Sequence, residues 1–169
     1  MPALYYVRHG LTDWNQQGRL QGHRDTSLNE RGRKQAVRCG EILGALFARA
    51  GRDAADYGYV SSPLMRARTT MELMRGALAL PPEGYDVDAR EHNKWLFRPP
   101  GGETYEEVAA RVGAWYATLE KDTVVSAHGG TARAMIAFLG IAKPDEAVHH
   151  SVDQGVVYVF ADRSIGRYA

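Results

Sequence analysis

Two histidines occupy the same kind of position far apart in the chain. The apolar run of residues 4–7 leads directly into Arg8-His9-Gly10, and the run of residues 123–127 leads into His128-Gly129. Short apolar runs of this kind are typical of buried strands. Open parallel sheets hold their ligand sites at the edge where such strands end. The two runs therefore predict one site that is built from both strand ends.

The residue types at these strand ends suit a phosphomonoester, which carries two negative charges. Arg8 offers a planar guanidinium that stays charged and matches phosphate oxygens. A neutral imidazole has a free lone pair near pH 7, so His9 is able to attack phosphorus and form a phosphohistidine. The adjacent charge of Arg8 is expected to lower the pKa of His9 and to favour this neutral form. His128 suits the stabilisation of charge on the transferred phosphoryl group.

Further motifs follow in a specific order. They are Arg8-His9-Gly10-Leu11-Thr12-Asp13-Trp14-Asn15, Ser61-Ser62-Pro63-Leu64-Met65-Arg66-Ala67, Pro100-Gly101-Gly102-Glu103 and Ala127-His128-Gly129-Gly130-Thr131. From near the N-terminus to about Leu139, their order and spacing resemble the histidine phosphatase superfamily, in its phosphoglycerate-mutase-like branch. The resemblance implies that His9 is the nucleophile, that His128 assists the transfer, and that the fold has three layers.

The assignment of Arg66 to the phosphate site depends on this resemblance. The residue lies one position off the apolar stripe of the helix expected over residues 63–78, which is also typical of a surface arginine. Because its sequence context resembles that of the family, we expect Arg66 to bind the phosphate together with Arg8. Neighbouring loops offer weaker candidates for phosphate or substrate contacts, although such residues are also common in ordinary loops. These candidates are Thr12, Asn15, Arg19, Gln21, Gly22 and Gly129.

The chain departs from the family where a general acid is expected. Family members usually carry a glutamate between the second helix and the Pro-Gly-Gly-Glu loop. Here residues 85–98 form a short connection without the family's Trp-Glu-Gly sequence. In one alignment Glu91 is the acid and the following loop is shortened. In the other, which we favour, residues 90–98 match the stretch before Pro-Gly-Gly and the acid-bearing segment is missing.

Composition narrows the class of protein. The 169 residues fit a single domain, 1–169, with 44% hydrophobic and 24% charged residues. A net charge of +1 gives no reason to expect a nucleic-acid or membrane partner. Without a targeting segment or a long apolar span, we expect a cytoplasmic protein. No residue spacing suggests a metal site, the pair His149-His150 included, and we expect no cofactor.

Apolar periodicity predicts an alternation of strands and helices. Strands are expected at residues 3–7, 57–61, 123–127 and 156–161, with a long irregular loop over residues 11–28. Helices are expected from a Ser27–Glu30 capping box to about Ala50, over 63–78, from a Thr104–Glu107 capping box to about Leu119, and over 130–139. This order predicts an α/β fold, a three-layer α/β/α sandwich around an open, mostly parallel sheet.

Three functions fit these observations. The first is a phosphatase that works through phospho-His9 on a small phosphorylated metabolite. The second is a mutase of the phosphoglycerate type, which would return the phosphoryl group to a product. Mutases of this family tend to be longer, and a short chain has little material for a lid that excludes water. The third is a module that binds a phosphorylated ligand but lacks a competent acid. The sequence identifies neither the phosphomonoester nor the oligomeric state.

Overall fold

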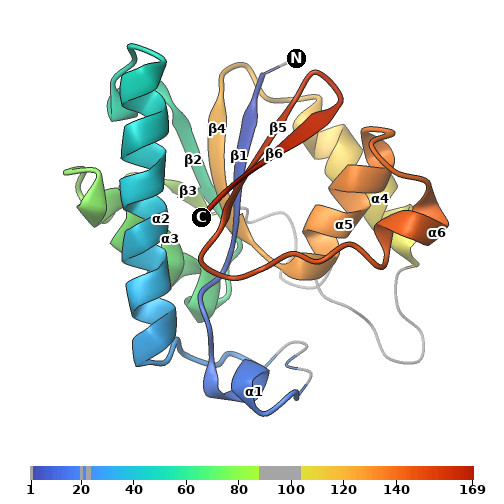
Figure 1. Cartoon of the computed structure of the whole chain (residues 1–169), viewed down its shortest axis with the longest axis horizontal. Helices are drawn as coiled ribbons and strands as arrows, with labels where there is room; N and C mark the ends of the chain where they lie inside the picture. The colour runs from blue at the N-terminus through green and yellow to red at the C-terminus, as the bar shows by residue number, and fades with distance from the viewer. Residues whose placement is uncertain (1, 20, 22–23, 88–103) are drawn as a thin grey trace.

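The fold is built on a twisted central sheet (Figure 1). The computed structural model describes residues 2–19, 21, 24–87 and 104–169. Within them the sheet has six strands in the order β3-β2-β4-β1-β5-β6. Their bounds are β1 (Leu4–Arg8), β2 (Gly58–Ser61), β3 (Asp86–Val87), β4 (Thr123–Ala127), β5 (Val157–Ala161) and β6 (Ser164–Tyr168). The first four strands in this order pair in parallel, whereas β5 and β6 pair antiparallel, so the sheet is mostly parallel as predicted.

Helices cover both faces of the sheet, which confirms the predicted three-layer arrangement (Figure 1). One side carries α2 (Glu30–Arg49) and α3 (Met65–Ala77), and the other carries α4 (Tyr105–Tyr116), α5 (Gly129–Phe138) and α6 (Pro144–Ala147). Two short elements complete the described fold: α1 (Asp13–Gln16) and the 3-10 turn η1 (Ala54–Asp56). The sequence analysis missed α1, α6 and the edge strands β3 and β6, which are too short or too exposed for a clear apolar period.

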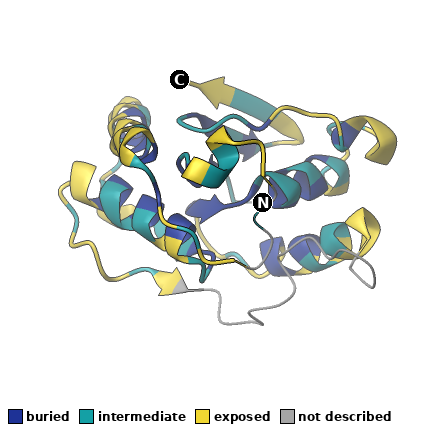
Figure 2. Ribbon diagram, turned by 90° about the horizontal axis from the view of Figure 1, so that it is seen from below, coloured by how far each residue is buried: buried dark blue, intermediate teal, exposed yellow. Residues whose placement is uncertain are grey.

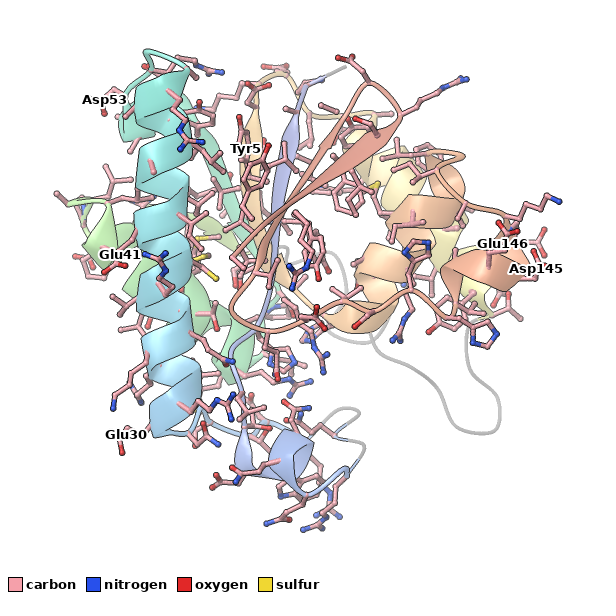
Figure 3. The ribbon with its side chains drawn as sticks, in the orientation of Figure 1. Tyr5, Glu30, Glu41, Asp53, Asp145 and Glu146 are labelled. Carbon is pink, nitrogen blue, oxygen red and sulfur yellow. The ribbon has the colours of Figure 1, made fainter. Side chains whose placement is uncertain are left out.

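Two apolar cores lie on opposite faces of the sheet. Neighbouring residues of β4 serve different cores: Val124 packs with Phe47 on the α2–α3 side, and Val125 packs with Met135 on the α4–α5 side. Every residue of β4 is buried, as expected for a central parallel strand. Figure 2 shows the buried residues between the layers. Figure 3 shows Glu41 on the outside of α2, with Asp145 and Glu146 on α6 facing away from the sheet.

The structure corrects the predicted start of α2 and confirms the predicted capping box of α4. The N-cap of α2 is Asn29, not Ser27, and its side chain accepts a hydrogen bond from the Gly32 amide at 2.9 Å. The backbone amide of Asn29 also donates to Leu11 O at 3.0 Å, which fixes this residue at the helix start. The predicted Thr104–Glu107 capping box is present, with reciprocal bonds of 2.6 and 3.2 Å.

Strand register aligns the residues of interest at one edge of the sheet. Arg8 pairs with Ala127 across β1 and β4, and Ser61 pairs with Ser126 across β2 and β4. The chain therefore leaves three parallel strands at the same level, with His9, His128 and Ser62 as the next residues. The predicted convergence of the two strand ends follows directly from this register.

A close backbone approach holds the loop after β1. A Cβ atom placed on Gly10 would collide with the carbonyl oxygen of Gly32 in α2, and a Cβ placed on Gly32 would collide with the backbone of Leu11. Both positions therefore require glycine for packing. This contact sets the distance between the His9 loop and α2.

We predict that Gly10→Ala destabilises the protein by about 1–3 kcal/mol, because backbone atoms must move to accept the methyl group. Gly76→Ala is the matched control, since a Cβ on this helical glycine meets nothing within 4 Å. That control should be stabilising by about 0.5–1 kcal/mol. Urea denaturation measures both changes. Equal stability of the wild type and Gly10→Ala would contradict the packing argument.

Candidate active site

His9 is fixed in one tautomer. Its ring is 4% exposed, and its Nδ1 lies 2.9 Å from the carbonyl oxygen of Gly10. Because a carbonyl only accepts hydrogen bonds, Nδ1 must carry the proton and donate it. The lone pair of the neutral ring therefore lies on Nε2. The backbone of His9 is also anchored, since its amide donates to Ala127 O at 2.9 Å.

The surroundings keep His9 neutral. Burial is the main cause that lowers its pKa, to about 3, and the charges of Arg66 and Arg8 lower it further. The sequence analysis expected the Arg8 charge to favour the neutral imidazole. In the structure that effect is present, but it is smaller than the effects of burial and of Arg66. The lone pair on Nε2 is thus available well below neutral pH.

His128 faces His9 across the edge of the sheet. The two ring centroids lie 5.3 Å apart with an interplanar angle of 60°. The Nε2 atom of His128 shares a hydrogen bond of 2.9 Å with the hydroxyl of Ser62, and the Tyr6 hydroxyl donates to the His128 carbonyl at 2.6 Å. Burial, followed by the charges of His9, Arg66 and Arg8, lowers the pKa of His128 well below its ordinary value.

Arg66 is buried beside the two histidines, not on the surface. It is 2% exposed, and one terminal nitrogen donates to Arg24 O at 2.9 Å. Burial lowers its pKa to about 10; the nearby Asp25 raises it and the charge of Arg8 lowers it. The α3 helix that carries Arg66 is tied to the His9 loop, because Gly10 N donates to the Thr70 hydroxyl at 3.0 Å.

Arg8 is the second cation of this edge. One terminal nitrogen donates to Val152 O at 2.9 Å, while its buried Nε has no hydrogen-bond partner among the described residues. Gly129 lies against it, since a Cβ on this glycine would be 3.7 Å from Arg8 Nε. Burial is the main cause that lowers the pKa of Arg8. The guanidiniums of half-buried Arg8 and buried Arg66, together with two neutral imidazoles at one edge, form a site suited to an anion with several oxygens.

The remaining candidates fall into four groups. Thr12 and Asn15 lie at the start of α1, where Asn15 Oδ1 accepts from the Thr12 amide and hydroxyl at 3.3 and 3.1 Å. Arg19 is exposed and lies over the Trp14 ring, 3.8 Å from its centroid. The side-chain oxygen of Gln21 accepts a hydrogen bond from Thr26. Gly22 and Glu91 lie outside the described residues.

Gln154 is a residue that the sequence analysis missed. Its amide nitrogen donates to His9 O at 3.2 Å and to Asn15 Oδ1 at 3.0 Å. With three donors on Asn15 Oδ1, the Asn15 NH₂ group must point elsewhere. Gln154 therefore orients Asn15 and holds the His9 loop against the turn before β5. The antiparallel pairing of β5 with β1 brings Gln154 here, and a sequence pattern gives little sign of such a contact.

The described residues contain no group of three or more His, Cys, Asp or Glu side chains that could hold a metal ion. In the same part of the chain, no helix is both long and apolar enough to span a membrane.

The sequence of this chain is similar to a known protein family and to several curated proteins. The sequence model of the "Histidine phosphatase superfamily (branch 1)" matches residues 4–86 and 83–163. A 2,3-bisphosphoglycerate-dependent phosphoglycerate mutase of Beijerinckia indica is 30% identical, with 95% of this chain and 92% of the mutase covered. A Bacillus subtilis protein described as the uncharacterized phosphatase PhoE is also 30% identical, with coverages of 86% and 81%.

Among solved structures, a mycobacterial glucosyl-3-phosphoglycerate phosphatase in complex with VO3 superposes with a TM-score of 0.73. It is 25% identical, and the match covers 99% of this chain and 97% of that protein.

We predict that acid destabilises the folded protein through its buried histidines. His9 and His128 are neutral when folded, but in the unfolded chain they bind protons below about pH 6.5. The unfolded state then holds more protons, so the free energy of unfolding falls as pH falls, by up to about 1.4 kcal/mol per pH unit for each group. Denaturation at several pH values between 5 and 7 measures this slope.

His9→Asn should reduce this pH dependence, whereas His149→Asn, at an exposed histidine, serves as the matched control and should leave it unchanged. An identical slope in the wild type and His9→Asn would contradict the assignment of a neutral buried His9.

We predict that Gln154→Leu weakens the binding of inorganic phosphate about three- to tenfold, because it removes two hydrogen bonds that position His9 and Asn15. Isothermal titration calorimetry measures the affinity. Gln17→Leu, at an exposed position of the same region, is the control. If Gln154→Leu loses stability but keeps the wild-type phosphate affinity, Gln154 supports only the fold.

Proposed function

The chain belongs to the histidine phosphatase superfamily (branch 1), and from this premise we propose that it is a phosphatase that hydrolyses a small phosphomonoester through a phosphohistidine on His9. The observation that carries the proposal is the neutral His9 ring, which has its lone pair on Nε2 and whose pKa is lowered by the charges of Arg66 and Arg8. These features support the proposal of a nucleophile next to an anion site at the ends of β1 and β4.

The proposed reaction has two displacements. Arg8 and Arg66 bind the phosphate oxygens, and His9 Nε2 attacks phosphorus while the bond to the ester oxygen breaks. The departing oxygen takes a proton from a general acid or from water. Water then attacks the phosphorus of phospho-His9, the phosphorus–nitrogen bond breaks, and inorganic phosphate leaves with the neutral imidazole restored. His128 donates to the oxygens of the transferred group in both steps.

Hydrolysis is favoured over mutase activity by the size of the chain. The alignment with the Beijerinckia indica mutase extends over 198 positions, more than the 169 residues of this chain, so the mutase has insertions that this chain lacks. With less material to cover the site, water reaches phospho-His9 more readily. Mutase activity remains the second candidate function, because several similar curated proteins are phosphoglycerate mutases.

Two proposals concern the general acid: the segment that carries it is missing, or Glu91 is the acid. The family model matches in two pieces that meet at residues 83–86. This break lies just before Glu91 and supports the proposal that the acid-bearing segment is missing. In that case aryl phosphates, whose leaving groups need little protonation, should be hydrolysed much faster than alkyl phosphates. If Glu91 is the acid, Glu91→Gln should slow alkyl phosphates by two to four powers of ten, in order of magnitude.

We predict that an activated phosphate donor labels His9 with an acid-labile, base-stable phosphoryl group, and that the label appears equally in the presence of a chelator. The arginines supply the positive charge, which is why we propose that no metal ion is needed. Phosphate-specific mass spectrometry locates the label, and a panel of phosphomonoesters then measures turnover.

His9→Asn is the decisive variant, and His150→Asn, an exposed histidine, is its control. The proposal fails if label or turnover survives in His9→Asn. A phosphoenzyme that forms but transfers its phosphoryl group to phosphoglycerate faster than to water would favour the mutase.

A further inference from the structure

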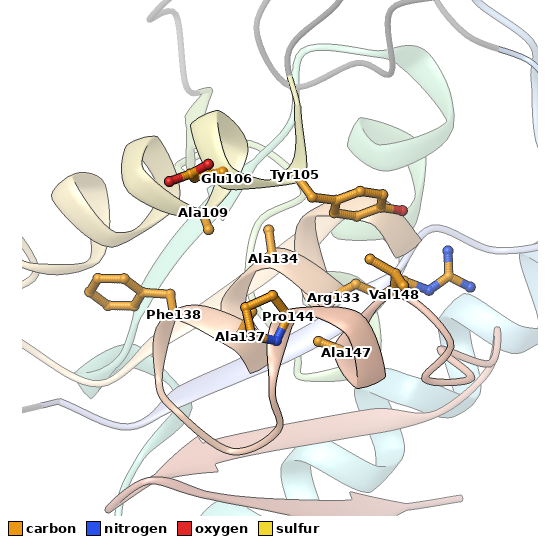
Figure 4. A pocket seen from close by; sticks show the side chains of 10 residues that line it. All are labelled: Tyr105, Glu106, Ala109, Arg133, Ala134, Ala137, Phe138, Pro144, Ala147 and Val148. Carbon is orange, nitrogen blue, oxygen red and sulfur yellow. The ribbon is translucent and has the colours of Figure 1, made fainter.

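A groove whose lining includes none of Arg8, His9, Arg66 and His128 lies between α4, α5 and α6. Its volume is about 360 Å³, within the range of sites that hold small molecules. Figure 4 shows its lining, with Phe138 towards one end and Arg133 and Val148 towards the other. The lining residues are Tyr105, Glu106, Ala109, Arg133, Ala134, Ala137, Phe138, Pro144, Ala147 and Val148.

The groove is apolar because its walls carry short side chains. Four alanines, one on α4, two on α5 and one on α6, leave the space between the three helices unfilled. Phe138 bounds the far end, where its ring packs against Gly113 of α4. The polar lining residues are Tyr105, Glu106 and Arg133. Such a surface offers an apolar group burial but few hydrogen bonds, so it suits a hydrocarbon or aromatic group.

The groove begins next to the phosphate site. The α5 helix starts directly after His128, and Gly130, Ala134 and Ala137 lie on one face of it at helical spacing. Ala134 is only one turn, about 6 Å along the axis, from Gly130. The Tyr105 hydroxyl lies 4.0 Å from the Cβ position of Gly130, so Tyr105 reaches the same end of the helix.

Arg133 connects the groove with the anion site. It lies one turn after Gly129 on the same face of α5, and a Cβ placed on Gly129 would be 3.7 Å from Arg8 Nε. A hydrogen bond of 2.9 Å from its Nε to His150 O holds the Arg133 side chain over the end of α6. The charge of Arg133 lowers the pKa of Arg8, which agrees with the closeness of the two guanidiniums. The end of the groove nearest the phosphate is therefore its cationic end.

We propose that this groove binds the apolar part of the leaving group, so that the substrate class is phosphomonoesters with an aromatic or aliphatic body. This inference rests on the proposed phosphatase function. The phosphate lies among Arg8, Arg66, His9 and His128, the ester oxygen points along α5, and the apolar body extends past Arg133 towards Phe138. The nearness of Arg133 to Arg8 and of Tyr105 to Gly130 favours a substrate group over a partner protein.

Two aryl phosphates test this proposal. Phenyl phosphate and 4-butylphenyl phosphate have leaving groups of nearly equal acidity and differ in their apolar length. If the butyl chain is buried in the groove, the wild type should have a kcat/KM for the longer ester at least about tenfold above that for phenyl phosphate. A ratio near one would overturn the proposal.

Ala109→Phe fills the groove and should bring this ratio close to one. Ala110→Phe is the matched control, because it adds the same side chain at the neighbouring, exposed position of α4. Ala137→Phe fills the groove from α5 and should act like Ala109→Phe. If both groove variants keep the wild-type ratio, the groove does not bind the substrate. A change in oligomeric mass with an unchanged ratio would assign the groove to a second copy of the chain.

Binding of the corresponding non-hydrolysable phosphonates separates the two proposals. Phenylphosphonate and 4-butylphenylphosphonate are titrated into the wild type and Ala109→Phe by calorimetry. If the longer phosphonate binds more tightly than the shorter one to the wild type but not to Ala109→Phe, the groove binds the apolar group. If no ester is hydrolysed in that case, only the proposed phosphatase function fails. Equal affinity for both phosphonates, together with turnover of both esters, refutes the groove and leaves the phosphatase in place.

Discussion

The site depends on one electrostatic constraint: two arginines are held away from bulk water and close enough to repel each other. Arg66 is 2% exposed, and both its burial and the charge of Arg8 lower its pKa. Desolvation and repulsion of this kind favour the neutral form of any further basic group, such as an imidazole, in the same place. His9 and His128 are accordingly neutral, as the proposed nucleophilic role of His9 requires. A phosphate dianion relieves the same repulsion, so a single arrangement of charge provides both anion affinity and a reactive imidazole.

Backbone carbonyls make this burial possible. Arg66 donates to Arg24 O, Arg8 donates to Val152 O, and His9 donates to Gly10 O. These acceptors satisfy buried N–H groups and orient the three side chains. The close contact between Gly10 and Gly32 holds the backbone that carries the Gly10 carbonyl, which accepts from the His9 ring.

The sequence predicted the parts of this arrangement that depend on short-range patterns. Apolar runs ending in Arg8-His9-Gly10 and His128-Gly129 indicated the strands, and parallel pairing then required their ends to meet. Arg66 was different, because the apolar stripe of α3 is equally compatible with an exposed side chain. Only the resemblance of its sequence context to a known family indicated burial. Gln154 and the start of α2 at Asn29 depend on contacts with distant residues, Gln154 with His9 and Asn29 with Leu11, which no local pattern contains.

The proposed substrate class brings two independent features of the chain together. If the acid-bearing segment of the family is missing, the enzyme works best on esters whose leaving oxygen needs little protonation, as in aryl phosphates. The groove along α5 selects for an apolar leaving group by burial, and it makes no use of the acid. A phenolic leaving group satisfies both requirements, since its ring is apolar and its oxygen is a good leaving group. A long aliphatic alcohol has an apolar body that fits the groove, but its oxygen is a poor leaving group. A sugar hydroxyl meets neither requirement, because the sugar is polar and its oxygen is also a poor leaving group. The two features together therefore favour aryl phosphates over sugar phosphates as substrates of this site.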